Sequence, residues 1–204
     1  MLFRSPTHII IIPVLHKEES RAQVLDYCTK LKSDLQNINF AGRNIEVEID
    51  SRDLRGGDKM WHWIKRGAPI ILEVGPRDIA EDSVFLTRRD KLKEKSSQKR
   101  THFLATVTNQ LQEMQDNLLN RALAFREANT VKIDTKEDFY KFFENENSGF
   151  AYSHWNGSPE VEEQIKTDLK VTIRCIPFDG DKTPGKCVIT GEPSTQRVYF
   201  AKSY

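Results

Sequence analysis

Four consecutive isoleucines near the start of the chain constrain its fold more than any other feature. The run from Thr7 to Val14, THIIIIPV, is almost continuously apolar and rich in β-branched side chains. A strand with apolar side chains on both faces is typical of the centre of an α/β sheet that helices cover on both sides. The sequence therefore predicts that this segment is a central strand of such a sheet.

A helix and a second strand are predicted to follow. From about Glu18, apolar side chains recur at spacings of three and four, which places them on one face of a helix. These side chains belong to Val24, Cys28, Leu31, Leu35 and Ile38. We expect residues 39–42 to end this helix. Residues 45–50 then alternate between apolar and acidic side chains, so we expect a half-exposed strand whose three carboxylates, Asp50 among them, face solvent.

The remaining segments up to residue 100 complete a first domain. A short helix is expected over residues 57–66, because Gly67 suits the position after a helix end and Pro69 prevents continuation. Strands are expected at residues 69–74 and 84–87. The order strand, helix, strand, helix, strand, strand describes a small mixed sheet with flanking helices. The polar segment KEKSSQKR, residues 93–100, is the nearest thing to a linker.

One long helix is predicted from Thr101 to Ala128. Its apolar residues hold near-heptad spacing over about seven turns. They are Leu104, Val107, Leu111, Met114, Leu118, Ala122 and Phe125. This stripe could pack on its own domain or on a partner helix, and we favour its own domain because a single apolar stripe usually faces a core.

Residues 129–204 are predicted to form a second, smaller domain. Helices are expected around residues 138–146 and 159–168, strands at 149–155 and 171–176, and a final hairpin that ends with a strand at 197–202. The predicted fold class is therefore α/β. It comprises a small mixed-sheet domain with flanking helices (1–100), a long connecting helix (101–128) and a small α+β domain (129–204).

Charge is balanced over the whole chain but not along it. The 31 basic and 30 acidic side chains leave a net charge of +1, so any electrostatic binding surface must be local. Residues 52–100 hold thirteen Lys and Arg against eight Asp and Glu, whereas residues 134–168 lean acidic. The basic excess lies in the first predicted domain.

Cysteine use and hydropathy indicate the compartment. The three cysteines and the absence of a signal-like start give no disulfide framework, and we expect a reduced, cytoplasmic protein. No apolar run approaches the roughly 18 residues that a membrane-spanning helix needs. We therefore expect no membrane association.

Catalytic and metal-binding patterns are missing from the sequence. It contains no phosphate-binding GxxxxGK[ST], GxGxxG, GxSxG or HExxH motif, and its five histidines are scattered singly. Cys175 and Cys187 lie in what we expect to be one sheet, but a structural zinc site needs four ligands, and Thr190 stands where a CxxC pair would have its second thiol. We expect small buried cysteines rather than zinc.

Basic residues gather at predicted strand and helix ends between residues 50 and 90. Arg52 and Arg55 follow one strand, Lys59 begins a helix, and Arg88 and Arg89 end another strand. Such cations usually form a solvated surface. If these ends converge on one edge of the sheet, however, they would form a site for phosphate or nucleic acid.

Large side chains beside these cations could stack on nucleic-acid bases. Trp61, Trp63 and Met60 lie within the predicted short helix. A Trp next to a helix more often belongs to the core than to a base-stacking platform. We therefore expect both tryptophans to belong to the core.

The same region resembles the anticodon-binding domain of prolyl-tRNA synthetases. GDKMWHWIKRGAPIILEVGPRD followed by RRD is similar to that family's pattern GxKxxxWExxGxPxRxExGPRD followed by RRD. PTHIIIIPV resembles the first strand of that domain, and VTIRCIPFD with GKCVITGEPSTQRVYFAKSY resembles the C-terminal domain of archaeal/eukaryotic-type and some bacterial enzymes. The resemblance covers essentially the whole chain. It implies an anticodon-binding domain, a connecting helix and a zinc-binding-like domain whose last residue, Tyr204, reaches toward the catalytic domain.

The sequence departs from the family pattern at functional positions. In the relatives, a Glu and an Arg seven residues apart help to read the anticodon guanines, and those positions are Ile64 and Ile71 here. An isoleucine side chain cannot hydrogen-bond to a guanine edge, so base-specific readout is either lost or moved to other cations. The candidates are Arg52, Lys59, Arg88, Arg89 and the lysines after RRD. Met60 stands where the relatives have a stacking aromatic residue. The family's four zinc-binding cysteines are reduced to Cys175 and Cys187, so we expect the last domain to fold without metal.

The resemblance implies a tRNA-binding function. The residues expected to contact tRNA are Arg52, Arg55, Lys59, Met60, Arg88, Arg89 and Lys93. The implied partners are tRNA(Pro) and the catalytic domain of the same enzyme, with a homodimer expected only for the full-length protein and no binding of DNA. The full enzyme would join proline to tRNA using ATP and magnesium. The ATP-binding motifs of that reaction do not occur in this sequence, so we expect no cofactor and no activity in this chain alone.

Two other functions are weighed against tRNA binding. The chain could be a free-standing interaction or accessory module without base-specific anticodon readout, in which Ile64 and Ile71 form an exposed apolar patch. An independent small enzyme is disfavoured because no set of nucleophile, base and electrophile can be assembled. Whether the chain is a fragment or a natural stand-alone protein stays open.

Overall fold

The computed structural model describes residues 7–15 and 18–203, and it divides the chain into two compact units, residues 1–121 and 122–204. The boundary falls inside the long helix rather than on either side of a separate connecting segment. The first part of that helix belongs to the core of unit 1. Within the described ranges, no helix is long and apolar enough to span a membrane.

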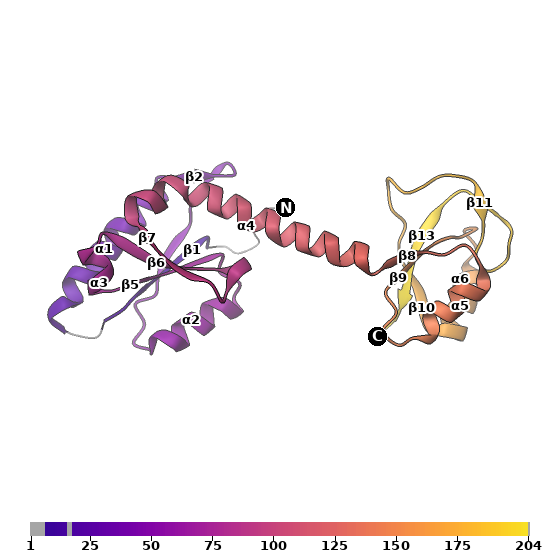
Figure 1. The fold of residues 1–204 in the computed structure, drawn as a ribbon, viewed down its shortest axis with the longest axis horizontal. Helices are drawn as coiled ribbons and strands as arrows, with labels where there is room; N and C mark the ends of the chain where they lie inside the picture. Colours follow the sequence, from indigo (N-terminus) through magenta and orange to yellow (C-terminus); the bar gives the residue numbers. More distant parts are fainter. Residues whose placement is uncertain (1–6, 16–17, 204) are drawn as a thin grey trace. The chain divides into compact units, whose positions relative to one another are not determined.

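Unit 1 is built on a five-stranded mixed sheet with the strand order β4-β1-β5-β6-β7 (Figure 1). Its strands are β1 (Ile9–Pro13), β4 (Val47–Ile49), β5 (Ile70–Val74), β6 (Ser83–Arg88) and β7 (Lys95–Lys99). Strand β1 pairs in parallel with both β4 and β5, whereas β6 pairs antiparallel with both β5 and β7. All four isoleucines of β1 are buried, which confirms the predicted central strand.

Helices cover the two faces of this sheet unequally (Figure 1). Helices α1 (Glu18–Gln36), α3 (Pro76–Ala80) and the first part of α4 (Arg100–Ala128) pack on the face to which Ile9 and Ile11 point. Helix α2 (Gly56–Lys65) packs on the opposite face, over Ile10 and Ile12. The alternation of β1 side chains thus explains why the run is apolar throughout. The short strands β2 (Asn39–Phe40) and β3 (Arg43–Asn44) form a separate hairpin.

Helix α4 packs on its own unit, as favoured from the sequence. Four of its side chains are fully buried in the unit 1 core: Phe103, Val107, Leu111 and Met114. The predicted stripe is wrong at both ends, and Ala122 is exposed. Phe103 rather than Leu104 lies deepest, and the side chain of Phe125 is 68% exposed, because the helix passes out of the unit 1 core before reaching it.

The polar segment expected as a linker is the edge strand β7. Residues 95–99 hydrogen-bond to β6 in antiparallel register, followed without a gap by α4. Their side chains are almost all exposed, so the strand lacks the apolar alternation by which strands are found in a sequence. A short 3₁₀ turn, Arg89–Lys91, joins the β6 end to this region. Helix α3 and strand β8 were also not predicted.

Unit 2 has a four-stranded sheet with the order β10-β13-β9-β8. Its strands are β8 (Thr130–Lys132), β9 (Phe150–His154), β10 (Val171–Cys175) and β13 (Arg197–Lys202). Helices α5 (Lys136–Glu144) and α6 (Pro159–Leu169) pack on one face (Figure 1). Side chains from both helices and from alternate strand positions form the core, with Phe139, Phe143 and Phe200 at its centre.

The last strand lies in the middle of this sheet, which corrects the predicted final hairpin. Strand β13 pairs antiparallel with both β9 and β10, while β11 (Gly185–Lys186) and β12 (Pro193–Ser194) form a separate two-stranded ladder. Cys175 is therefore on the four-stranded sheet and Cys187 follows the small ladder, so the two cysteines do not share a sheet as expected.

Candidate nucleic-acid interface

Asp50 organises the loop between strand β4 and helix α2. It was expected on the solvent side, but it is only 2% exposed. Its carboxylate accepts hydrogen bonds from Arg52 Nε at 2.8 Å, Arg52 Nη2 at 2.6 Å and Trp63 Nε1 at 2.8 Å. The bonds from Arg52 hold the Asp50 pKa at about 2 against the opposing effect of burial, and the bond from Trp63 adds to them. Asp50 is buried because it has these partners.

Lys59 and Met60 are not surface residues, which corrects their place among the expected tRNA contacts. The Lys59 side chain is 4% exposed, and its Nζ donates to the backbone carbonyl of Asp50 at 3.1 Å. Met60 is buried between α2 and the sheet with Trp63 and Ile71. Met60 is therefore not available to a base. Lys59 is held by the Asp50 carbonyl, although it also lines a pocket at the start of α2.

The basic residues do not converge on one sheet edge, contrary to the expectation. Arg52 and Arg55 follow the carboxyl end of β4, next to the end of β1. Arg88 pairs with Ile70 at the start of β5, because β6 runs antiparallel to β5. Arg88 and Arg89 therefore lie at the opposite edge from Arg52 and Arg55.

Arg88 is largely neutralised within the protein. Its Nη2 lies 2.8 Å from Asp90 and its Nη1 lies 2.9 Å from Glu113, and its side chain is mostly buried. Arg89 is exposed and donates to the Gly67 carbonyl at 3.3 Å, just past the end of α2. Lys93 is also exposed. At this edge, Arg89 and Lys93 are thus accessible to a ligand, whereas Arg88 forms ion pairs within the protein.

Helix α2 connects the two edges and carries an exposed aromatic side chain. Its ten residues span about 15 Å. Trp61 is 62% exposed, whereas Trp63 is buried. The prediction that both tryptophans belong to the core is therefore confirmed for Trp63 and wrong for Trp61. Lys65 and Arg66, which had not been considered as contacts, are exposed at the end of this helix.

We call these exposed groups the α2 surface. It consists of Arg52, Arg55, Trp61, Lys65, Arg66 and Arg89. The spacing of buried Met60 and Trp63 could have shown that Trp61 and Lys65 point outward, because residues three apart share a helix face. The arrangement places cations at both ends of a helix with an aromatic ring between them.

A pocket of about 330 Å³ lies at the Arg52 end of this surface. It opens between the segments that follow β1 and β4, which lead to helices on opposite faces of the sheet. Such a switch point is the usual place for ligands in α/β sheets. Four cations line the pocket with one carboxylate, so its net positive lining suits an anionic group. They are Arg21, Arg52, Arg55 and Lys59, and the carboxylate is Asp53.

Ile64 and Ile71 do not form an exposed apolar patch. Ile71 is 2% exposed and belongs to the cluster beneath α2, and Ile64 is partly buried against the same cluster. The two isoleucines thus belong to the core or pack against it, at the positions where prolyl-tRNA synthetases are expected to have base-reading side chains. The interaction-module alternative loses the observation on which it depended.

The two cysteines of unit 2 lie in different surroundings. The Cys175 thiol is exposed on β10, and the Cys187 thiol is buried beside the turn that contains Thr190. Burial opposes ionisation of Cys187, but hydrogen bonds from Thr190 and its neighbours lower the pKa of this thiol. Among residues 7–15 and 18–203, no group of three or more His, Cys, Asp or Glu side chains could hold a metal ion. Tyr204 lies outside the described residues.

Comparison with known families agrees with the two-unit architecture. Residues 8–110 match the family model "Anticodon binding domain", which is more than half of the chain. The chain belongs to the anticodon-binding domain family. Residues 136–204 match the model "Prolyl-tRNA synthetase, C-terminal". The resemblance to the C-terminal portion of prolyl-tRNA synthetases is thereby confirmed.

Curated relatives match nearly the whole chain. It is 48% identical to proline–tRNA ligase 2 of Anaeromyxobacter dehalogenans, 46% to proline–tRNA ligase of Bdellovibrio bacteriovorus and 42% to that of Akkermansia muciniphila, each over 98% of this chain. The chain spans only about two fifths of the length of these relatives, 41%, 41% and 40%.

Proposed function

We propose that the α2 surface binds the anticodon stem and loop of tRNA(Pro), and that the chain is the tRNA-binding portion of a proline–tRNA ligase. The observation that supports this most is Trp61, an exposed ring between cations at the two ends of α2. A stacked base and neutralised phosphates are what such a surface can hold. The membership of unit 1 in the anticodon-binding domain family supports the same function.

The whole ligase would join proline to tRNA(Pro) at the expense of ATP, with magnesium as a cofactor. In that enzyme, unit 1 would position the tRNA through its phosphates and through stacking on Trp61. Ile64 and Ile71 cannot donate or accept hydrogen bonds, so base-specific readout would have to come from the cations of the α2 surface. We further propose that unit 2 folds without zinc, because Cys175 is exposed on the four-stranded sheet and Cys187 is buried after the separate two-stranded ladder.

The test is binding of a tRNA(Pro) transcript to the 204-residue chain over a range of salt concentrations. Neutralising phosphates releases counterions, so affinity should fall steeply with salt, and each cation removed should reduce the slope of log K against log salt by about 1. Arg55→Ala with Arg89→Ala should therefore flatten the slope by about 2. Trp61→Leu should weaken binding about tenfold at any salt concentration.

The matched control is Arg77→Ala, which removes an exposed cation on α3, at the other face of the sheet. This variant should bind tRNA like the unaltered chain. Equal weakening by Arg77→Ala and Arg55→Ala would mean that only overall charge matters, and the assignment to the α2 surface would then be wrong.

A further inference from the structure

In the described part of the chain, one face of the unit 2 sheet is not covered by helices, and part of it carries three aromatic rings. Helices α5 and α6 cover one face, and Ala151, Val198 and Phe200 point toward them. The residues next to these in β9 and β13 point to the other face of the sheet. They include Phe150, Tyr152 and Tyr199. All three are half-buried, so their rings are neither in the core nor fully in water.

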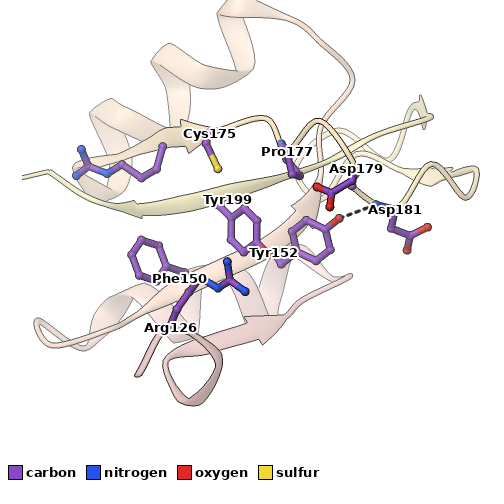
Figure 2. A pocket seen from close by; sticks show the side chains of 10 residues that line it. Arg126, Phe150, Tyr152, Cys175, Pro177, Asp179, Asp181 and Tyr199 are labelled. Carbon is purple, nitrogen blue, oxygen red and sulfur yellow. Dashed lines mark hydrogen bonds between the residues drawn. The ribbon is translucent and has the colours of Figure 1, made fainter. Parts of the chain in front are cut away.

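These rings are arranged as one platform (Figure 2). Tyr152 and Tyr199 are register partners on the two central strands, and they stack with centroids 4.7 Å apart and an angle of 28°. Phe150 meets Tyr199 edge-on at 6.5 Å. The Tyr152 hydroxyl accepts from the Asp181 backbone N–H at 2.9 Å, which ties the loop after β10 to the platform.

A pocket of about 550 Å³ lies over this platform and is bordered by charged side chains. Arg126 extends from α4 toward the rings (Figure 2). Arg174 lies on the neighbouring strand β10, where its guanidinium donates to the Lys202 backbone carbonyl. The guanidinium of Arg126 has only a long contact, 3.9 Å, with Glu127. Within the described residues, Asp179 has no hydrogen-bond or ion-pair partner. The site thus offers partly exposed aromatic rings, cations and a carboxylate acceptor.

We propose that this aromatic face binds an unpaired nucleotide of RNA. The base would pack against the exposed parts of the Tyr152 and Tyr199 rings. The guanidinium groups of Arg126 and Arg174 would contact the flanking phosphates, and Asp179 would accept a hydrogen bond from the base or from the 2′-hydroxyl. A four-stranded sheet with aromatic side chains on its central strands is a general solution for binding single-stranded RNA. This site is separate from the α2 surface and does not depend on it.

Cys175 supplies a local measure of occupancy. Its thiol is exposed and lines the pocket, whereas Cys28 and Cys187 are buried. In the native 204-residue chain, iodoacetamide should therefore modify Cys175 first, and the modified peptide can be identified by mass spectrometry. Saturating hexaadenylate should slow this modification at least tenfold. Modification of Cys175 at an unchanged rate with millimolar hexaadenylate would overturn the proposal.

Variants separate the platform from general charge. Tyr199→Leu and Arg126→Ala should each raise the hexaadenylate concentration needed for half protection about tenfold, while Tyr199→Phe, which keeps the ring, should stay within about threefold of the unaltered chain. Arg121→Ala, an exposed cation on the same helix, is the control and should have no effect. Arg126 is itself exposed, so its replacement leaves the fold intact even if Tyr199→Leu does not.

The outcomes also separate this proposal from tRNA binding by the α2 surface. Protection of Cys175 that persists in Trp61→Leu with Arg55→Ala supports an independent site. Protection that vanishes in that variant but survives Tyr199→Leu places the RNA on unit 1 and overturns the platform. A tRNA affinity insensitive to the α2 variants would refute the proposed function alone, since Cys175 protection is measured with a different RNA.

Discussion

The indole Nε1 of Trp63 donates a 2.8 Å hydrogen bond to Oδ2 of Asp50, and both residues are buried. Asp50 follows strand β4 and Trp63 lies on the inner face of helix α2. The bond therefore fixes the helix on the sheet and, with it, the orientation in which Trp61 is exposed. Arg52 completes the arrangement by pairing with the same carboxylate while keeping part of its side chain at the surface.

Asp50→Asn should destabilise the protein by about 2 kcal/mol, the usual cost of losing a hydrogen-bonded buried charge. The amide cannot accept both bonds from Arg52 and the one from Trp63. Urea unfolding followed by tryptophan fluorescence measures the change. Asp53→Asn, at an exposed position in the same loop, is the control and should shift stability by less than about 0.5 kcal/mol. Equal effects at the two positions would contradict the assigned role of Asp50.

The same carboxylate should make stability depend on pH in the acid range. The Asp50 pKa is about 2 in the folded protein and about 3.9 in an unfolded chain. Its contribution is therefore complete above about pH 5 and is lost as the pH falls toward 2, since protonation then favours the unfolded state. The difference in unfolding free energy between the unaltered chain and Asp50→Asn should narrow by about 2 kcal/mol over that window. Asp181, whose pKa is also about 2, is present in both proteins, so its contribution does not affect the difference between their unfolding free energies.

Gly149→Ala should destabilise unit 2 by about 2 kcal/mol through overpacking. A Cβ at this position would lie 2.1 Å from the Asn129 carbonyl oxygen, which accepts the 2.7 Å hydrogen bond from the Phe150 N–H.

Gly57→Ala should have the opposite effect on stability. A Cβ there has no neighbour within 4 Å, and Ala favours helix α2, so stability should rise by up to about 1 kcal/mol. Thermal unfolding of both variants checks the pair.

Removal of metal should leave unit 2 unchanged. The proposal that it folds without zinc predicts the same thermal unfolding midpoint before and after dialysis against EDTA, because no metal binding energy contributes to folding. Elemental analysis of the purified chain should find well under one zinc per molecule. A midpoint that falls on chelation and recovers with added zinc would show that a metal site exists.

Much of the architecture could be predicted from local patterns. The isoleucine run, the apolar stripe of α1 and the glycine and proline after α2 each specify an element through the contacts of neighbouring residues. Strand β7 could not be found in this way, because its side chains are exposed and its pairing with β6 is made by the backbone. The same holds for the central place of β13, which depends on pairing with strands distant in sequence.

The sequence by itself determined that the chain is α/β, that its basic excess lies in residues 52–100, and that its motif is that of an anticodon-binding domain. The tertiary structure decided which of those cations are accessible. Lys59 and Asp50 are buried together, Arg88 is paired with two carboxylates, and the antiparallel direction of β6 separates Arg88 and Arg89 from Arg52 and Arg55. Residue type and spacing set local structure, but exposure and pairing depend on long-range packing, which adjacent residues do not encode.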